Sequence, residues 1–153
     1  MTEYLDGKIA FFHENFQTQT DLFSFLAHEL QEKDFVTKDF FQKICEREII
    51  FPTGLFVNGI GVAIPHTDSD WVKRSQIAFM SLENPMTFYE MGTNDKEIAV
   101  NLVFMLALKE PHEQPEMLMK LIAMFQADKV LESLSKVDKI EDYLQILQNN
   151  GIN

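Results

Sequence analysis

The histidine at position 66 is the side chain of this sequence whose surroundings best suit chemistry. It follows Val62-Ala63-Ile64, a small, apolar and partly β-branched segment that suits a buried strand. Pro65 keeps Ile64 extended and cannot donate a ladder hydrogen bond, so we expect strand pairing to stop there. His66 then lies on stiff backbone just past a strand end, where open α/β sheets place functional side chains. A structural histidine bonded to a nearby carbonyl fits the same pattern.

A second chemically useful side chain, Arg47, begins the stretch R-E-I-I-F-P-T-G-L. We predict that Arg47 lies near the end of a helix, where its guanidinium can engage two phosphoryl oxygens. The alternative is a solvated arginine that only complements the helix dipole. We expect Glu46 and Glu48 to face solvent or to pair locally. An imidazole suits the relay of a phosphoryl group, because the neutral ring is a nucleophile near pH 7.

The stretch 47–67 combines R-E and P-T-G with G-V-A-I-P-H-T. This combination resembles the phosphohistidine signature of the type-2 IIA domains of the bacterial sugar phosphotransferase system, the fructose, mannitol and galactitol group and its regulatory relatives. The phenylalanine before P-T-G and the long link to the histidine are most similar to the galactitol-specific IIA proteins. The order of elements on both sides also agrees, so the resemblance extends over nearly the whole chain.

The resemblance implies a role in phosphoryl transfer. His66 would accept phosphate from the phosphocarrier HPr, through Nε2, and pass it to a cysteine of a IIB component that serves a membrane IIC component. Arg47 would be the main electrostatic helper, and no metal, nucleotide or other cofactor would be needed. The implied sugar is galactitol or a related polyol. Similar domains also act as phosphorylation sensors that bind a protein target, and the sequence is compatible with that alternative.

Many members of this family carry a second active-site histidine at the start of the helix that follows the central strand. His112 is the candidate here, although the family position falls nearer to Gln114. Either of these two side chains can hydrogen-bond the phosphoryl group, and His112 can equally be an exposed loop histidine. Gln114, Thr67 and Phe56 are the candidate partner-binding residues. Phe56, with Phe51 and some of the eight methionines, can form an adaptable apolar rim around the site.

The loop after His66 permits a rival hypothesis, in which His66, Asp68 and Asp70 bind a divalent metal in a hydrolase. Three ligands in one short loop are a weak signal, because loop aspartates usually cap turns or helices. Gly59 and Gly61 do not form a phosphate-cradling P-loop. We expect these glycines to allow a tight turn and to leave the approach to His66 open.

The composition narrows the possible partners. The 153 residues contain 13 Lys and Arg against 24 Asp and Glu, a net charge of -11 that disfavours nucleic acids and anionic membranes and favours basic protein surfaces. Cys45 is the single cysteine, so no intrachain disulfide can form, and we expect it to be a core residue. Residues 1–12 do not have the pattern of a signal peptide, and no apolar run is long enough for direct membrane insertion. We predict a cytoplasmic protein.

The hydrophobic pattern predicts a single α/β domain over residues 1–153, a mixed sheet of about five strands flanked by helices. The resemblance implies the same architecture, that of the mannitol-type IIA domains. Residues 99–106 are almost continuously apolar and should form the centre of the sheet. The other strands are expected at 8–12, 62–64, 76–82 and 86–89, with a turn at 84–85 and a loop at 92–95. The predicted helix starts are Thr20, Thr37, Pro115, Asp128 and Asp138.

Overall fold

The computed structural model describes residues 3–93 and 95–153 of the chain. Met1 and Thr2, at the start of the predicted N-terminal segment, and Asn94, in the predicted loop 92–95, lie outside the described residues. No helix in the described part of the chain has both the length and the apolar character that a membrane span requires.

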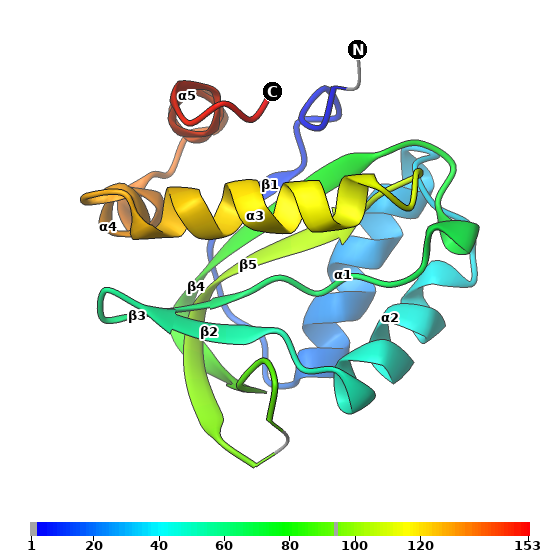
Figure 1. Ribbon diagram of the computed structural model, residues 1–153, viewed down its shortest axis with the longest axis horizontal. Helices are drawn as coiled ribbons and strands as arrows, with labels where there is room; N and C mark the ends of the chain where they lie inside the picture. Colours follow the sequence, from blue (N-terminus) through cyan, green and yellow to red (C-terminus); the bar gives the residue numbers. More distant parts are fainter. Residues whose placement is uncertain (1–2, 94) are drawn as a thin grey trace.

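A five-stranded mixed sheet forms the middle of the structure, in the order β1-β4-β5-β3-β2 (Figure 1). The pairs β1–β4 and β3–β5 are parallel, whereas β4–β5 and β2–β3 are antiparallel. The predicted central strand is confirmed, because β5 is the third strand in this order. The strand bounds are β1 (Ala10–Glu14), β2 (Gly54–Val57), β3 (Ile60–Ala63), β4 (Gln76–Tyr89) and β5 (Glu97–Ala107).

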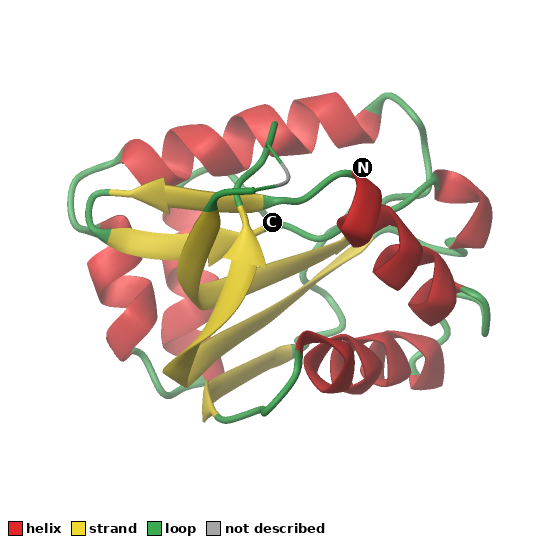
Figure 2. Ribbon diagram, turned by 90° about the horizontal axis from the view of Figure 1, so that it is seen from below, coloured by secondary structure: helices red, strands yellow, loops and turns green. Residues whose placement is uncertain are grey.

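Helices cover both faces of the sheet (Figures 1 and 2). The helices α1 (Gln19–Glu32) and α2 (Phe40–Ile50) pack on one face. The helices α3 (Glu113–Gln126), α4 (Val130–Lys136) and α5 (Ile140–Asn149) pack on the other. A short 3-10 turn, η1 (Ser69–Trp71), lies before β4. The predicted α/β fold class is therefore confirmed, with one apolar core on each side of the sheet.

The strand count of five is right, but the predicted strands 76–82 and 86–89 are parts of one strand, β4. The expected turn at Asn84-Pro85 lies inside β4, where the register with β5 shifts between Ser81 and Met86. An irregular pairing of this kind accommodates a proline, because its missing N–H is not needed for the ladder. The fifth strand is β2, which follows directly after the glycine of P-T-G and was not expected.

The helices form where the apolar periodicity predicts them, but their first residues differ. The N-cap of α1 is Thr18, whose Oγ1 accepts a hydrogen bond from the backbone N–H of Asp21 at 3.0 Å, so Thr20 is already inside the helix. The helix α3 begins at Glu113, two residues before Pro115. The other three begin after Asp39, Lys129 and Lys139, none of which makes a side-chain cap hydrogen bond. These starts lie one or two residues from the predicted ones, which is the usual difference between definitions of a helix boundary.

Gly61 in β3 lies directly against β5, so it has a packing role rather than the expected role of opening the approach to His66. A Cβ atom at this position would lie 1.9 Å from the carbonyl oxygen of Ala99. We expect Gly61→Ala to lower the free energy of unfolding by about 3 kcal/mol, because backbone must move to relieve the overlap.

Gly59 is the control for Gly61, because it has positive φ but open space around its Cβ position. With Asn58 it forms the tight turn between β2 and β3, as predicted. Gly59→Ala should cost only about 1 kcal/mol of strain. Denaturant unfolding of both variants measures the difference, and equal losses would contradict the close contact of Gly61 with β5.

Candidate functional site

His66 is held against the central strand, which places it at the carboxyl ends of β3 and β5. The N–H of Leu106 donates to the carbonyl of Pro65 at 2.9 Å, and His66 forms a parallel bridge with Leu106. Pairing therefore continues past Ile64, contrary to the prediction, because Pro65 lacks a donor but keeps its acceptor. The backbone of His66 is fixed by a sheet contact as well as by the stiffness of the proline.

The imidazole of His66 is buried, with 9% of the residue exposed, and one ring nitrogen is occupied. Nδ1 lies 2.7 Å from the carbonyl oxygen of Ile64. A carbonyl only accepts, so Nδ1 carries the proton in the neutral ring and the lone pair lies on Nε2. Burial lowers the pKa of His66; the Ile64 carbonyl opposes this, the charge of Arg47 adds to it, and Asp68 opposes it. The net lowering keeps the ring neutral, and hence nucleophilic, near pH 7.

Arg47 lies in the last turn of α2, as predicted, and its guanidinium is oriented by two neighbours. Nη1 contacts the Oδ1 atom of Asp68 at 3.4 Å, and the guanidinium carbon lies 4.6 Å from the ring centroid of Phe51. Nε is buried and has no hydrogen-bond partner among the described residues. About a third of the side chain (31%) stays exposed, so the guanidinium remains open to an acceptor such as a phosphoryl oxygen.

Glu48 is buried, with 4% exposed, so of the two expected alternatives it pairs locally and does not face solvent. Its two carboxylate oxygens accept hydrogen bonds from the N–H and from the hydroxyl of Thr53, both at 2.8 Å. Glu46 does face solvent and pairs with Lys43 on the same helix, as expected. Burial raises the pKa of Glu48 to about 7, and the Thr53 hydrogen bonds only partly offset this.

This raised pKa predicts a pH-dependent stability. The ordinary value is 4.5, so between 4.5 and about 7 the folded protein holds a proton that the unfolded chain has lost. The free energy of unfolding should therefore fall by about 3 kcal/mol as the pH rises from 4.5 to about 7. Glu48→Gln should remove this contribution, because an amide can both accept from the N–H and donate to the hydroxyl of Thr53. Urea unfolding of both proteins at several pH values tests this, and identical pH profiles would contradict it.

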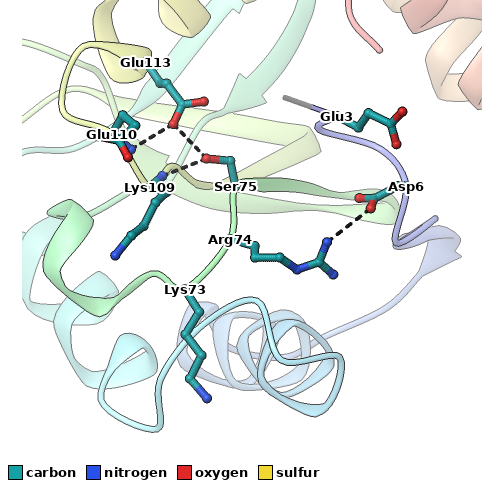
Figure 3. A pocket seen from close by; sticks show the side chains of 8 residues that line it. All are labelled: Glu3, Asp6, Lys73, Arg74, Ser75, Lys109, Glu110 and Glu113. Carbon is teal, nitrogen blue, oxygen red and sulfur yellow. Dashed lines mark hydrogen bonds and ion pairs between the residues drawn. The ribbon is translucent and has the colours of Figure 1, made fainter. Parts of the chain in front are cut away.

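The first turn of α3 is anchored by the buried carboxylate of Glu113, which Figure 3 shows among its neighbours. It accepts hydrogen bonds from the hydroxyl of Tyr4 at 2.6 Å and from the hydroxyl of Ser75 and the N–H of Glu110, both at 2.8 Å. Burial raises the pKa of Glu113, but these hydrogen bonds outweigh it and hold the pKa below its usual value. The start of α3 is thereby tied to the N-terminal segment and to the residue before β4.

This anchor positions Gln114 rather than His112 toward the loop after β3. The Gln114 amide donates to the carbonyl of Thr67 at 3.4 Å, and Gln114 lines a pocket of about 270 Å³ together with Asp68 and Asp70. His112 is exposed and lines a different pocket, shared with Tyr4 and the C-terminal residues 151–153. Of the two candidates that the sequence left open, Gln114 is the one adjacent to the segment that carries His66.

The remaining candidate residues lie at different distances from the imidazole. Thr67 is buried directly after His66. Phe56 is 60% exposed and pairs with Gly61, five residues before His66 in an extended segment, which corresponds to about 16 Å. Phe51 is the aromatic residue that borders Arg47.

The sequence also permitted a metal site at His66, Asp68 and Asp70. No group of three or more His, Cys, Asp and Glu side chains in residues 3–93 and 95–153 is arranged to hold a metal ion.

The sequence and the fold were compared with those of known proteins. Residues 3–150 match the family model described as "Phosphoenolpyruvate-dependent sugar phosphotransferase system, EIIA 2". The chain belongs to this family. It is a IIA domain of the phosphotransferase type, and the resemblance that the sequence suggested is confirmed.

Three proteins illustrate the relationship of this IIA domain to its family. The galactitol-specific EIIA component of Escherichia coli strain K12 is 28% identical over 120 residues, which are 78% of this chain and 79% of that protein. The transcriptional regulator ManR of Bacillus subtilis is 36% identical over 115 residues, 75% of this chain but 16% of ManR. The E. coli mannitol IIA domain, solved in complex with phosphorylated IIB, has the same fold, with a TM-score of 0.74 at 19% identity over 93% of this chain and 95% of that one.

Proposed function

We propose that this single IIA domain carries a phosphoryl group on Nε2 of His66, taken from phospho-HPr and passed to a cysteine of a IIB component. The observation that supports this most directly is the hydrogen bond from Nδ1 to the Ile64 carbonyl, which leaves Nε2 with its lone pair. The similarity to the galactitol-specific protein supports galactitol or a related polyol as the sugar that a cognate membrane IIC component transports. We place the reaction in the cytoplasm.

The proposed transfer needs no cofactor and no proton movement at His66. The Nε2 lone pair attacks the phosphorus atom, the new N–P bond forms, and the bond to the donor histidine breaks with its electron pair going to the donor ring. The ring of His66 then carries positive charge, which the Ile64 carbonyl stabilises through the Nδ1 proton. In the second half-reaction a cysteine thiolate forms an S–P bond, and the N–P electron pair returns to Nε2.

Arg47 supplies the positive charge for the phosphoryl oxygens in this proposal. Its guanidinium contacts Asp68, two residues after His66 in the sequence, and 31% of its side chain is exposed to an incoming group. Charge-assisted hydrogen bonds of this kind favour the transition state, where the transferred group is only loosely bonded to either nitrogen.

The partner-binding surface in this proposal extends over the end of α2. Ile49, Ile50 and Phe51 are exposed by 76%, 60% and 57%, although they are apolar and lie next to Arg47. An exposed apolar group beside a reactive residue is typical of a protein contact site. With a net charge of -11 on the chain, complementary partners should bring basic surfaces to the rim of this patch.

A reconstituted transfer assay tests the proposal. The protein is incubated with radiolabelled phosphoenolpyruvate, enzyme I and HPr, and a galactitol-type IIB protein is then added. We expect acid-labile label on this chain that depends on HPr and moves to IIB within seconds. Absence of label on the chain in the presence of phospho-HPr would overturn the proposal.

A sensor role is the second candidate function, and the 36% identity to a segment of ManR favours it. In that case the same His66 would be phosphorylated, but the phosphate would persist after IIB is added. The phosphorylated and unphosphorylated forms would then differ in affinity for a protein target. The second step of the same assay therefore separates transport from sensing.

The second active-site residue can be tested by comparing two adjacent substitutions. Gln114→Ala should slow phosphoryl transfer by roughly twofold to tenfold, the usual worth of one hydrogen bond. His112→Ala should leave the rate unchanged, because His112 lines another pocket. Single-turnover transfer from phospho-HPr measures both rates. A larger loss in the His112 variant than in the Gln114 variant would reverse the assignment.

A further inference from the structure

Glu48 joins the two parts of the site that carry the reactive groups. It lies in the last turn of α2, one residue after Arg47, and its carboxylate holds both the N–H and the hydroxyl of Thr53. Thr53 lies directly before β2, whose partner β3 leads to His66. The contact therefore closes the short connection between the helix that carries Arg47 and the hairpin that carries His66.

The connection continues from Thr53 to the imidazole through the backbone. The carbonyl of Thr53 accepts the N–H of Ile64 at 3.4 Å, and the carbonyl of Ile64 accepts Nδ1–H of His66 at 2.7 Å. One short series of contacts thus runs from the carboxylate of Glu48 to the ring of His66. A displaced Thr53 would shift the acceptor that holds the imidazole.

We propose that Glu48 is a positioning residue, which sets the placement of the Arg47 guanidinium relative to the His66 imidazole by clamping Thr53 to the end of α2. The inference rests on the proposed function of these two residues, but it concerns their geometry. Phosphoryl transfer depends strongly on such placement, because a misplacement of 1 Å can cost about a hundredfold in rate.

An acidic residue at position 48 is better explained by the positioning of Thr53 than by a contribution to stability. A buried carboxylate costs desolvation, which its two hydrogen bonds only partly recover, so well-packed apolar residues in place of both partners would stabilise the fold at least as well. The carboxylate instead provides two acceptors at a fixed spacing, one for each donor of Thr53. Such a paired contact fixes direction as well as distance.

Transfer kinetics of matched variants form the first part of the test. Glu48→Ala should slow transfer by roughly tenfold to a hundredfold, whereas Glu48→Gln, which keeps both contacts, should stay within about twofold of the wild type. Thr53→Val, which removes only the hydroxyl contact, should be impaired, and Thr53→Ser should restore the rate. Glu46→Ala is the control on the exposed face of the same helix. Wild-type rates in folded Glu48→Ala and Thr53→Val would overturn the proposal.

The second part of the test is a measurement of the pKa of His66. It needs no phosphate donor, so it still tests the positioning role of Glu48 if the proposed function fails. NMR titration gives the pKa of His66, which is set by its burial, the Ile64 carbonyl, Arg47 and Asp68. Arg47→Met should raise it. Glu48→Ala should shift it too, and by a different amount in the Arg47→Met background, because the part of the effect that acts through the guanidinium is then absent. Thr53→Val replaces Glu48→Ala in this cycle if the latter does not fold. Equal effects of the second substitution with and without Arg47 would refute the positioning role.

Discussion

We expect His66→Ala to accept no phosphate from phospho-HPr and to keep its fold. The substitution removes the nucleophile, so labelling should fall below detection rather than merely slow. Among the described residues the imidazole makes one side-chain hydrogen bond, to the Ile64 carbonyl, so its loss should cost about 1–2 kcal/mol of stability. Circular dichroism and thermal melting check the fold, and radiolabel transfer checks the phosphorylation.

The other histidines provide the controls for this result. His13 and His28 lie away from the site, on β1 and α1, and His112 lines a separate pocket. Alanine variants of these three should take up label at the wild-type rate. Labelling that survives in His66→Ala, or is lost in one of the controls, would assign the phosphate to a different residue.

Arg47→Met should slow phosphoryl transfer by roughly 10²–10³-fold, the cost of removing one preorganised electrostatic contact to a developing charge. Stability should change little, because the ion pair with Asp68 is partly exposed and such pairs contribute little to folding. Arg47→Lys should recover only part of the rate, since an ammonium ion cannot bind two oxygens in the geometry of a guanidinium. Rapid-quench measurement of a single transfer from phospho-HPr gives these rates.

Arg74 is a closely matched control for Arg47. It pairs with Asp6 at 3.4 Å and lies 4.4 Å from the ring centroid of Phe35, so Arg74→Met removes the same kinds of contact at a different place. We expect the Arg74 variant to transfer phosphate at the wild-type rate. Comparable losses in the two variants would indicate a general charge effect and would remove Arg47 from the proposed mechanism.

The core of the candidate site was predictable because its residues lie close together in the sequence. A small apolar segment before I-P-H predicts a strand end, and Arg47 falls in the last turn of a helix with a clear apolar face. The choice between His112 and Gln114 was not predictable, because it depends on the direction in which the first turn of α3 leaves the sheet. That direction is fixed by Glu113 through Tyr4, which is 109 residues away in the sequence.

Glu48 shows a different limit of sequence reasoning. A glutamate near a helix end is usually solvated, and no local pattern distinguishes one that turns inward to meet a threonine five residues later. The division of the strands failed for a similar reason. Asn84-Pro85 is a strong turn signal, but the long pairing of β4 with β5 outweighs it and absorbs the proline at a register shift. In both cases tertiary contacts decide between locally reasonable alternatives.

The position of the phosphate on the ring tests the central claim most directly. The protein is labelled with nitrogen-15 histidine and phosphorylated through HPr, and NMR then identifies the ring nitrogen that couples to phosphorus. We expect the coupling on Nε2 of His66, with Nδ1 still protonated and bonded to the Ile64 carbonyl. Coupling on Nδ1 of His66, or on any other side chain, would contradict the account.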